Sequence, residues 1–281
     1  ENSIPKKHAR LGFVTDSLEN TVDLLGQAIS TLESKADKTE WNVKGIVYRE
    51  KALETKGKVV ALFSGQGSQY MNMAKELFFN FPVMAAPFSA LDKLFTGKNG
   101  KSAAAARPLS DLVFPIAVFE DEELEAQQAQ LQLTENVQPA IGGISAGLLR
   151  IARDAGLQID FAAGHSFGEL TALWAAGVIA EDDYYKLAYA RGQAMAAPDD
   201  PDFDAGSMLA VMGKVEKLEE DLTEFPDVVM ANLNSKKQVV LAGPTADILQ
   251  AHDALKVKKY TVVKLPVSAA FHTPLVGHAQ K

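Results

Sequence analysis

The chain has 281 residues, 47% of them hydrophobic, and a formal net charge of −8. This length suffices for one large domain, or for a domain with a smaller partner, around a sizeable core. Cysteine is absent, which excludes disulfides, thiolate metal sites and a cysteine nucleophile and fits a cytoplasmic location. The net negative charge argues against nucleic-acid binding, which needs clustered Lys and Arg to release counterions. No apolar run approaches the roughly 18 residues that a membrane span needs. We therefore expect no metal, no nucleic acid and no membrane as partners.

Residues 1–56 differ in pattern from the rest of the chain. Apolar residues at helical spacing over 16–34, with Asp16 or Ser17 as the N-cap, predict a helix. Residues 41–48 predict one short strand. The segment is too short for a core of its own, so we interpret it as a linker module that packs on its neighbours. Because the chain lacks an initiator Met, we expect it to be a segment of a longer protein.

The pattern over 57–204 alternates strands with helices. Residues 58–63 are almost continuously apolar, as in a strand buried on both faces of a parallel sheet. Breaks are expected near Pro82 and Pro87, and residues 98–107 are expected to be a surface loop. The sequence therefore predicts an α/β domain. Its remaining elements are a largely helical stretch over 71–95, a helix over 137–155, a strand over 160–164 and helices over 168–176 and 181–196.

A second pattern begins after the proline-rich boundary at 198–201. Residues 205–267 predict the order βαββαβ, which is the ferredoxin-like unit. We therefore expect a small inserted subdomain, with 268–281 returning to the larger one. The expected strands are 207–212, 228–232, 238–242 and 260–267, and the expected helices are 215–225 and 246–255.

A Gly-x-Ser-x-Gly motif at 164–168 lies between the strand ending at Gly164 and the helix that follows. This context predicts a nucleophile elbow, a sharp turn that exposes the hydroxyl of Ser166. The backbone amide of Phe167 would face the oxygen of an acyl substrate. The motif indicates acyl chemistry on serine, without deciding between hydrolysis and transfer.

Ser166 needs a general base, and His272 is the candidate among the five histidines. It follows the last strand of the small subdomain, where a loop can place an imidazole over the elbow. His165 adjoins the serine and cannot easily reach its hydroxyl. The alternative is that His272 is an ordinary loop histidine.

The Gly-Gln-Gly sequence at 65–67 follows the first strand of the α/β domain. It lacks the Gly-Lys-Ser/Thr of a phosphate loop and the third Gly of a dinucleotide site. The amide of Gln66 can instead serve as a second oxyanion donor beside that of Phe167. An ordinary strand-to-helix turn is the alternative.

Arg191 lies in a predicted helix with apolar and aromatic neighbours, so its guanidinium needs an anionic partner. An internal ion pair is the interpretation that the residues alone favour. A bidentate clamp on a substrate carboxylate is the other.

Together these motifs resemble the acyltransferase family of fatty-acid and polyketide synthesis, the malonyl-CoA:acyl carrier protein transacylases. The resemblance covers about residues 57–281. Because the family continues with further elements, the resemblance implies that the large subdomain is truncated after Lys281. Ser64 stands where relatives commonly have proline, and Phe167 stands where they have leucine. The matching segments are 63–69 (Phe-Ser-Gly-Gln-Gly-Ser-Gln), 164–169 (Gly-His-Ser-Phe-Gly-Glu), 191–195 (Arg-Gly-Gln-Ala-Met), 270–274 (Ala-Phe-His-Thr-Pro) and 232–243.

The resemblance implies an α/β-hydrolase-like large subdomain with a parallel sheet, into which the ferredoxin-like subdomain is inserted. It implies that Ser166 takes malonyl from malonyl-CoA, that His272 shuttles the proton and that Arg191 pairs with the malonyl carboxylate. No cofactor would be bound, and the acceptor would be the phosphopantetheine of an acyl carrier protein. The further substrate-binding residues that it implies are His165, Phe271 and Asn232.

The longer sequence at 164–177 (Gly-His-Ser-Phe-Gly-Glu-Leu-Thr-Ala-Leu-Trp-Ala-Ala-Gly) and the linker at 1–56 resemble the acyltransferase domains of polyunsaturated fatty-acid synthases. That resemblance implies an adjacent ketosynthase domain in the same polypeptide, with 1–56 as the connector.

Two other classes of function stay open. A serine hydrolase would need an acid to orient the histidine, and Asp202 and Asp204 are the candidates. A non-catalytic scaffold is the third interpretation.

Lysines at 236–237 and 256–259 either contact coenzyme A phosphates or an acidic carrier protein, or are simply solvated.

Overall fold

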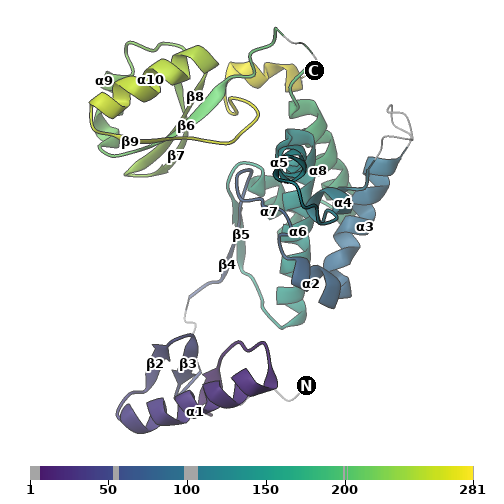
Figure 1. Ribbon diagram of the computed structural model, residues 1–281, viewed down its shortest axis with the longest axis vertical. Coiled ribbons are helices and arrows are strands. Elements are labelled where there is room, and N and C mark those ends of the chain that lie inside the picture. Colours follow the sequence, from purple (N-terminus) through teal and green to yellow (C-terminus); the bar gives the residue numbers. More distant parts are fainter. Residues whose placement is uncertain (1–6, 53–56, 98–106, 199, 201, 281) are drawn as a thin grey trace. The chain divides into compact units, whose positions relative to one another are not determined.

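The computed structural model describes residues 7–52, 57–97, 107–198, 200 and 202–280 and divides into two units, Glu1–Lys58 and Val59–Lys281 (Figure 1). Most of the surface loop expected at 98–107 lies outside the described residues, as does part of the boundary at 198–201.

The first unit combines helix α1 (Leu18–Ser34) with an antiparallel sheet of order β1-β3-β2. The N-cap is Ser17, whose hydroxyl accepts a hydrogen bond from the amide of Asn20 at 3.1 Å. The strands are β1 (Arg10–Gly12), β2 (Glu40–Val43) and β3 (Ile46–Arg49).

Two predictions for the first unit were wrong. The single strand expected at 41–48 is a hairpin, because Lys44 (φ 51°) and Gly45 (φ 82°) form a two-residue turn. The unit also has a small core of its own, in which Ala28 of α1 packs against Trp41 and Ile46 of the sheet.

The large subdomain of the second unit pairs β4 (Val60–Phe63) with β5 (Phe161–Gly164) in parallel. Its main core surrounds α6, whose buried residues pack with those of α3 and α8 (Figure 1). The helices are α2 (Lys75–Asn80), α3 (Pro82–Thr96), α4 (Leu109–Val113), α5 (Asp121–Gln132), α6 (Thr134–Asp154), α7 (Gly168–Ala175) and α8 (Glu181–Met195). The α/β class and the elements around the elbow are confirmed.

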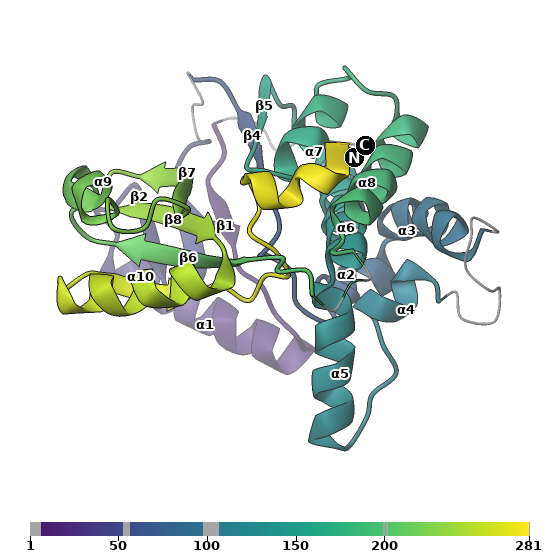
Figure 2. The ribbon, with the colours of Figure 1, turned by 90° about the horizontal axis from the view of Figure 1, so that it is seen from above.

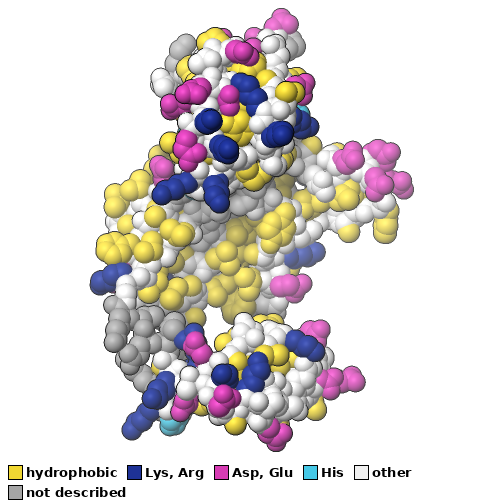
Figure 3. Space-filling model, turned by 90° about the vertical axis from the view of Figure 1, so that its left-hand side faces the viewer, with side chains coloured by type: hydrophobic (Ala, Val, Ile, Leu, Met, Phe, Trp, Pro, Cys, Tyr) yellow, Lys and Arg dark blue, Asp and Glu magenta, His cyan; other side chains and the backbone are white. Residues whose placement is uncertain are grey.

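Two local predictions for the large subdomain were wrong. Pro82 begins α3 as expected, but Pro87 lies inside that helix, where burial of the neighbouring Met84 and Phe88 offsets the missing hydrogen bond. The first strand is not buried on both faces, because Leu62 is 79% and Val60 48% exposed. Within the described residues, this sheet consists of β4 and β5 alone. Figure 3 views the molecule from the side on which these two strands lie and shows hydrophobic side chains gathered there.

The small subdomain has the ferredoxin-like order β7-β8-β6-β9, with all neighbours antiparallel. Helices α9 and α10 lie over one face of this sheet (Figures 1 and 2), and the side chains of that face pack on them. The helix expected over 215–225 is shorter, a 3-10 turn η1 (Val215–Lys217) followed by a single α turn, α9 (Leu218–Asp221). The other elements are β6 (Ser207–Met212), β7 (Val229–Ser235), β8 (Gln238–Gly243), α10 (Thr245–Val257), β9 (Thr261–Lys264) and a final 3-10 segment, η2 (Pro274–Gln280).

The opposite face of the same sheet carries Met208, Val240 and Ala242, which pack with Ala270 and Phe271. Side chains alternate between the two faces along each strand, so one face builds the core of the subdomain and the other supports the loop before His272.

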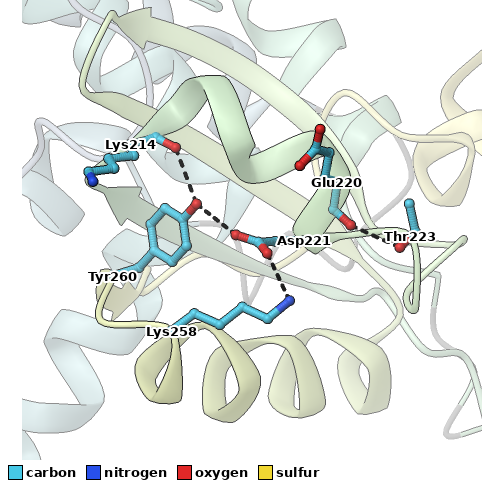
Figure 4. Close-up of polar contacts among 6 residues, drawn as sticks. All are labelled: Lys214, Glu220, Asp221, Thr223, Lys258 and Tyr260. Atoms are coloured by element: carbon cyan, nitrogen blue, oxygen red, sulfur yellow. Dashed lines mark hydrogen bonds and ion pairs between the residues drawn. The ribbon is translucent and has the colours of Figure 1, made fainter.

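A polar cluster joins α9 to the end of α10 (Figure 4). The carboxylate of Asp221 accepts from the ammonium of Lys258 and from the hydroxyl of Tyr260, each at 2.8 Å. These two hydrogen bonds lower the pKa of Asp221. Lys258, one of the lysines considered for coenzyme A or carrier binding, therefore has an internal partner.

Candidate active site

The elbow is a tight turn between β5 and α7, and its glycines are required by close packing. A Cβ on Gly164 would lie 2.0 Å from the carbonyl carbon of Gly168, and one on Gly168 would lie 2.2 Å from the carbonyl oxygen of Phe63. Ser166 has a φ of 53°, which is strained for a residue with a side chain. Ser166 lines a cavity from this turn.

The hydroxyl of Ser166 meets the imidazole of His272, with 3.0 Å between Oγ and Nε2. His272 also has a positive φ, 63°. Its loop is fixed by a hydrogen bond from the amide of Ala270 to the carbonyl of Ala205 at 2.7 Å, and by one from the hydroxyl of Thr273 to the carbonyl of Ala270 at 2.6 Å. The structure thus brings together two residues that are 106 positions apart in the sequence.

Burial lowers the pKa of the His272 imidazole, and the nearby charges of Arg191 and His165 lower it further, while Glu169 acts in the opposite direction. A lowered pKa keeps the imidazole neutral near pH 7, which is the form that can accept a proton from serine.

The loop after β4 touches the elbow at Gly65, where a Cβ would lie 2.4 Å from the carbonyl oxygen of His165. The backbone of His165 in turn donates to the carbonyl of Phe63 at 3.0 Å. Within the described part of the chain, the amides of Gln66 and Phe167 donate to no protein acceptor. Both amides are therefore available as oxyanion donors.

Arg191 lies on α8, half-buried, and donates from Nη1 to the amide oxygen of Gln138 at 2.6 Å. Its Cζ lies 6.0 Å from the centre of the Phe167 ring. Burial lowers the pKa of the guanidinium, and Glu169 opposes this. The internal ion pair considered above is not found among the residues that the structure describes.

These groups line a cavity of about 280 Å³ at the junction of the two subdomains. Every predicted site residue lines it except Phe167, whose ring is buried beneath it with Val137 and Ile141. His165 bridges the subdomains, since its Nε2 lies 3.1 Å from the Oδ1 of Asn234 on β7. The remaining lining residues are Gly67, Gln138, Met195, Met208, Ala210, Asn234, Gln238, Val240, Leu265, Pro266 and Val267.

The sequence analysis missed Gln138 as a site residue. A polar residue within the apolar run of α6 between Val137 and Ile141 was the available signal, because a buried amide needs hydrogen-bond partners.

An acid that orients His272 is not found among the described residues. The carboxylate of Asp204 instead accepts from the amides of Gly206 and Thr245, each at 2.8 Å, and from the hydroxyl of Thr245 at 2.6 Å. It therefore ties the start of β6 to the start of α10.

Two other kinds of feature are absent from the described part of the chain. No group of three or more His, Asp or Glu side chains there could hold a metal ion. None of the helices described is long and apolar enough to cross a membrane.

Comparison with known proteins gives a consistent result. The family profile described as "Acyl transferase domain" matches residues 60–281. A polyunsaturated fatty acid synthase polypeptide of Thraustochytrium sp. is 34% identical over 280 residues, which is 99% of this chain and 10% of the synthase polypeptide. The malonyl CoA-acyl carrier protein transacylase of Bacillus subtilis is 32% identical over 230 residues, 79% of this chain and 65% of the transacylase.

Solved structures agree. The acyltransferase domain from the second module of the salinomycin polyketide synthase superposes with a TM-score of 0.74 at 29% identity, over 98% of this chain and 57% of that one. A malonyl-transacylase in complex with a type II polyketide synthase acyl-carrier protein gives a TM-score of 0.65 at 29% identity, over 79% of this chain and 67% of that one. The chain therefore spans only part of each of these relatives.

Proposed function

This chain belongs to the acyl transferase family, and from that premise we propose that it moves a malonyl group from malonyl-CoA to the phosphopantetheine thiol of an acyl carrier protein. The observation that carries the proposal is the 3.0 Å contact between Ser166 and His272 in a cavity that also holds Arg191. Relatives named for malonyl CoA and acyl carrier protein supply the substrate class.

In the first half-reaction, the neutral imidazole of His272 takes the proton of Ser166 as Oγ attacks the thioester carbonyl. The amides of Gln66 and Phe167 stabilise the resulting oxyanion. The tetrahedral intermediate then expels the thiol of coenzyme A, which leaves with the proton held by His272. A malonyl ester remains on Ser166.

In the second half-reaction, His272 takes the proton of the carrier thiol, and the thiolate attacks the ester carbonyl. Collapse of this intermediate returns the proton from His272 to the oxygen of Ser166 and releases the malonyl thioester. The two steps share one oxyanion site, as a ping-pong transfer requires.

The malonyl carboxylate is assigned to Arg191, because its planar guanidinium can donate two parallel hydrogen bonds. His165 and Asn232 line the same cavity and are assigned to substrate binding. Phe271 also lines the cavity. We assign its ring to the exclusion of an α-methyl group, which would favour malonyl over methylmalonyl by about 1–3 kcal/mol.

The larger setting is part of the proposal. The match to a polyunsaturated fatty acid synthase polypeptide, of which this chain covers 10%, supports a multidomain synthase. We assign this synthase to the cytoplasm and place a ketosynthase domain in the same polypeptide. In that setting, residues 1–56 are the connector, 57–204 and 268–281 the large subdomain and 205–267 the small one.

Mass spectrometry after incubation with malonyl-CoA tests the proposal. One malonyl mass is expected on Ser166, and none on the Ser166→Ala variant. Ser89→Ala is the matched control, because the hydroxyl of this exposed α3 serine donates to the carbonyl of Ala85 in its own helix and lies outside the cavity lining. A folded wild-type protein without the added mass, or a Ser166→Ala protein that still carries it, would refute the proposal.

A serine hydrolase is the competing function, and the engagement of Asp204 by Thr245 counts against a hydrolase triad. Release of the acyl group from the Ser166 ester, with and without carrier protein, separates the two. Transfer requires release to be strongly accelerated by the carrier. Release to water at the same rate without the carrier would indicate a hydrolase.

Replacement of Arg191 by Ala tests the carboxylate assignment. The kcat/KM for malonyl-CoA should fall by about tenfold to a hundredfold, because a charge-assisted pair is lost. The kcat/KM for acetyl-CoA, which has no such carboxylate, should fall much less. Unchanged preference between the two donors would remove Arg191 from this role.

A further inference from the structure

We propose that Gln138 is a positioning residue that holds Arg191 ready for the substrate carboxylate and so determines the preference for malonyl over acetyl donors. This inference rests on the proposed function. Nothing in the sequence motifs pointed to Gln138.

Gln138 is 1% exposed, in the second turn of α6, so both ends of its amide need partners inside the protein. Its oxygen accepts the 2.6 Å hydrogen bond from Arg191. Its nitrogen lies 3.4 Å from the side-chain oxygen of Gln66 and 3.8 Å from the sulfur of Met195. An arginine only donates, so the amide oxygen must be the atom that faces it.

The chemical identity of the acceptor matters. A neutral amide fixes one nitrogen of the guanidinium and leaves its positive charge uncompensated, with other N–H groups free for a ligand. A carboxylate in the same place would form an internal ion pair and compete directly with the substrate. Gln138 therefore orients Arg191 without neutralising the positive charge of its guanidinium.

Gln138 also connects this arginine to the rest of the site. The backbone amide of Gln66 is assigned to the oxyanion, and its side chain lies between Gln138 and Thr134. The side-chain nitrogen of Gln66 is 3.5 Å from the hydroxyl of Thr134. That hydroxyl lies 2.6 Å from the hydroxyl of Ser268, in the loop that leads to His272. One end of α6 thus contacts the arginine, the oxyanion loop and the histidine loop.

The test compares three variants in steady-state transfer to one carrier protein, with malonyl-CoA and acetyl-CoA as donors. Gln138→Glu places a carboxylate beside the guanidinium. Gln138→Met keeps a similar volume and removes the amide, both the oxygen that accepts from Arg191 and the nitrogen near Gln66. Gln128→Glu is the matched control, since it adds the same charge on the exposed surface of α5. Far-ultraviolet circular dichroism and thermal unfolding verify that each variant is folded.

We expect Gln138→Glu to lower the malonyl-to-acetyl ratio of kcat/KM by about 10- to 100-fold, mainly through a higher KM for malonyl-CoA. Gln138→Met should lower the ratio less, because Arg191 keeps its charge and loses only its orientation. Gln128→Glu should leave the ratio at the wild-type value.

A wild-type ratio in Gln138→Glu, or an equal loss with both donors, would overturn the inference, because a merely structural role affects both donors alike. If Gln138→Glu does not fold, an unchanged ratio in Gln138→Met overturns it. Failure of the proposed function looks different: the wild-type protein itself then carries no malonyl ester on Ser166, and the inference falls with it.

Discussion

At the scale of single residues, the site depends on one positive charge that acts in two ways. The guanidinium of Arg191 is oriented by a neutral partner, Gln138, at 2.6 Å. The same charge disfavours protonation of His272 and so lowers the pKa of the imidazole, second only to burial. Under the proposed function, Arg191 therefore binds the substrate carboxylate and also keeps the general base neutral.

The pH profile of acyl transfer should show this effect. Activity requires neutral His272, so kcat/KM should fall as the pH drops through the pKa of the imidazole. The lowered pKa predicts that this acid limb lies below 6.5, the ordinary value for histidine. The profile should be measured with acetyl-CoA, because that donor has no carboxylate for Arg191.

The Arg191→Ala variant should reverse part of the lowering of the His272 pKa. Loss of the positive charge should raise the pKa of His272 and move the acid limb to higher pH, although burial still lowers the pKa. An acid limb that stays in place or moves to lower pH would show that the charge of Arg191 does not act on the base.

At the scale of elements, the elbow exists because β5 and α7 meet almost without a connection. The carbonyl of Phe63 on β4, the turn at Ser166 and the start of α7 approach so closely that Gly164 and Gly168 cannot carry side chains. This contact fixes the hydroxyl of Ser166 relative to the loop that carries Gln66. Under the proposed function, the precision of the oxyanion site is thus a property of backbone packing.

Two single glycine substitutions, one at the elbow and one elsewhere, test whether this close packing is required. Gly168→Ala should lower the free energy of unfolding by about 1–3 kcal/mol and reduce Ser166 acylation, because the new Cβ overlaps the carbonyl of Phe63. Gly26→Ala, inside α1 with nothing within 4 Å of the new Cβ, should instead stabilise its helix by about 1 kcal/mol. Thermal unfolding and ester formation measure both effects, and a Gly168→Ala variant as stable and active as wild type would contradict the packing argument.

Local patterns predicted most elements well. The strands of the small subdomain and the helices around the elbow follow from periodicity, turn residues and caps close in sequence. The hairpin at 41–48 was missed because its turn uses a positive φ at Lys44, a residue type that rarely signals one. The exposure of Leu62 was missed because an apolar run does not reveal which faces of a strand are covered.

The site was predictable only in part. The motif predicted Ser166 as the nucleophile and chain order favoured His272 as its base, and the structure places their side chains 3.0 Å apart. The partner of Arg191 could not be foreseen, because Gln138 reaches it across 53 residues of sequence. Contacts of this kind depend on how α6 and α8 pack, which no local pattern encodes.

At the scale of the whole molecule, the chain consists of two units, each with its own buried core. Each unit holds one of the two tryptophans, Trp41 in the first and Trp174 in the second. Trp41 stacks on Tyr48 with 5.4 Å between ring centres, and Trp174 stacks on Tyr184 at 5.2 Å. Both indoles are buried, so the fluorescence of each reports unfolding of its own unit.

Separate cores predict separate unfolding transitions. Ile46→Val removes one buried methyl group from the core of the first unit and should destabilise that unit by about 0.5–1.5 kcal/mol. In a Trp174→Phe background, the Trp41 transition should then move to lower denaturant concentration. In a Trp41→Phe background, the Trp174 transition should stay in place. Val47→Ala is the matched control, because this neighbour on β3 is 40% exposed and should shift neither transition appreciably. If Ile46→Val moved both transitions together, the two units would unfold as one, and the first would not be the independent module that its core indicates.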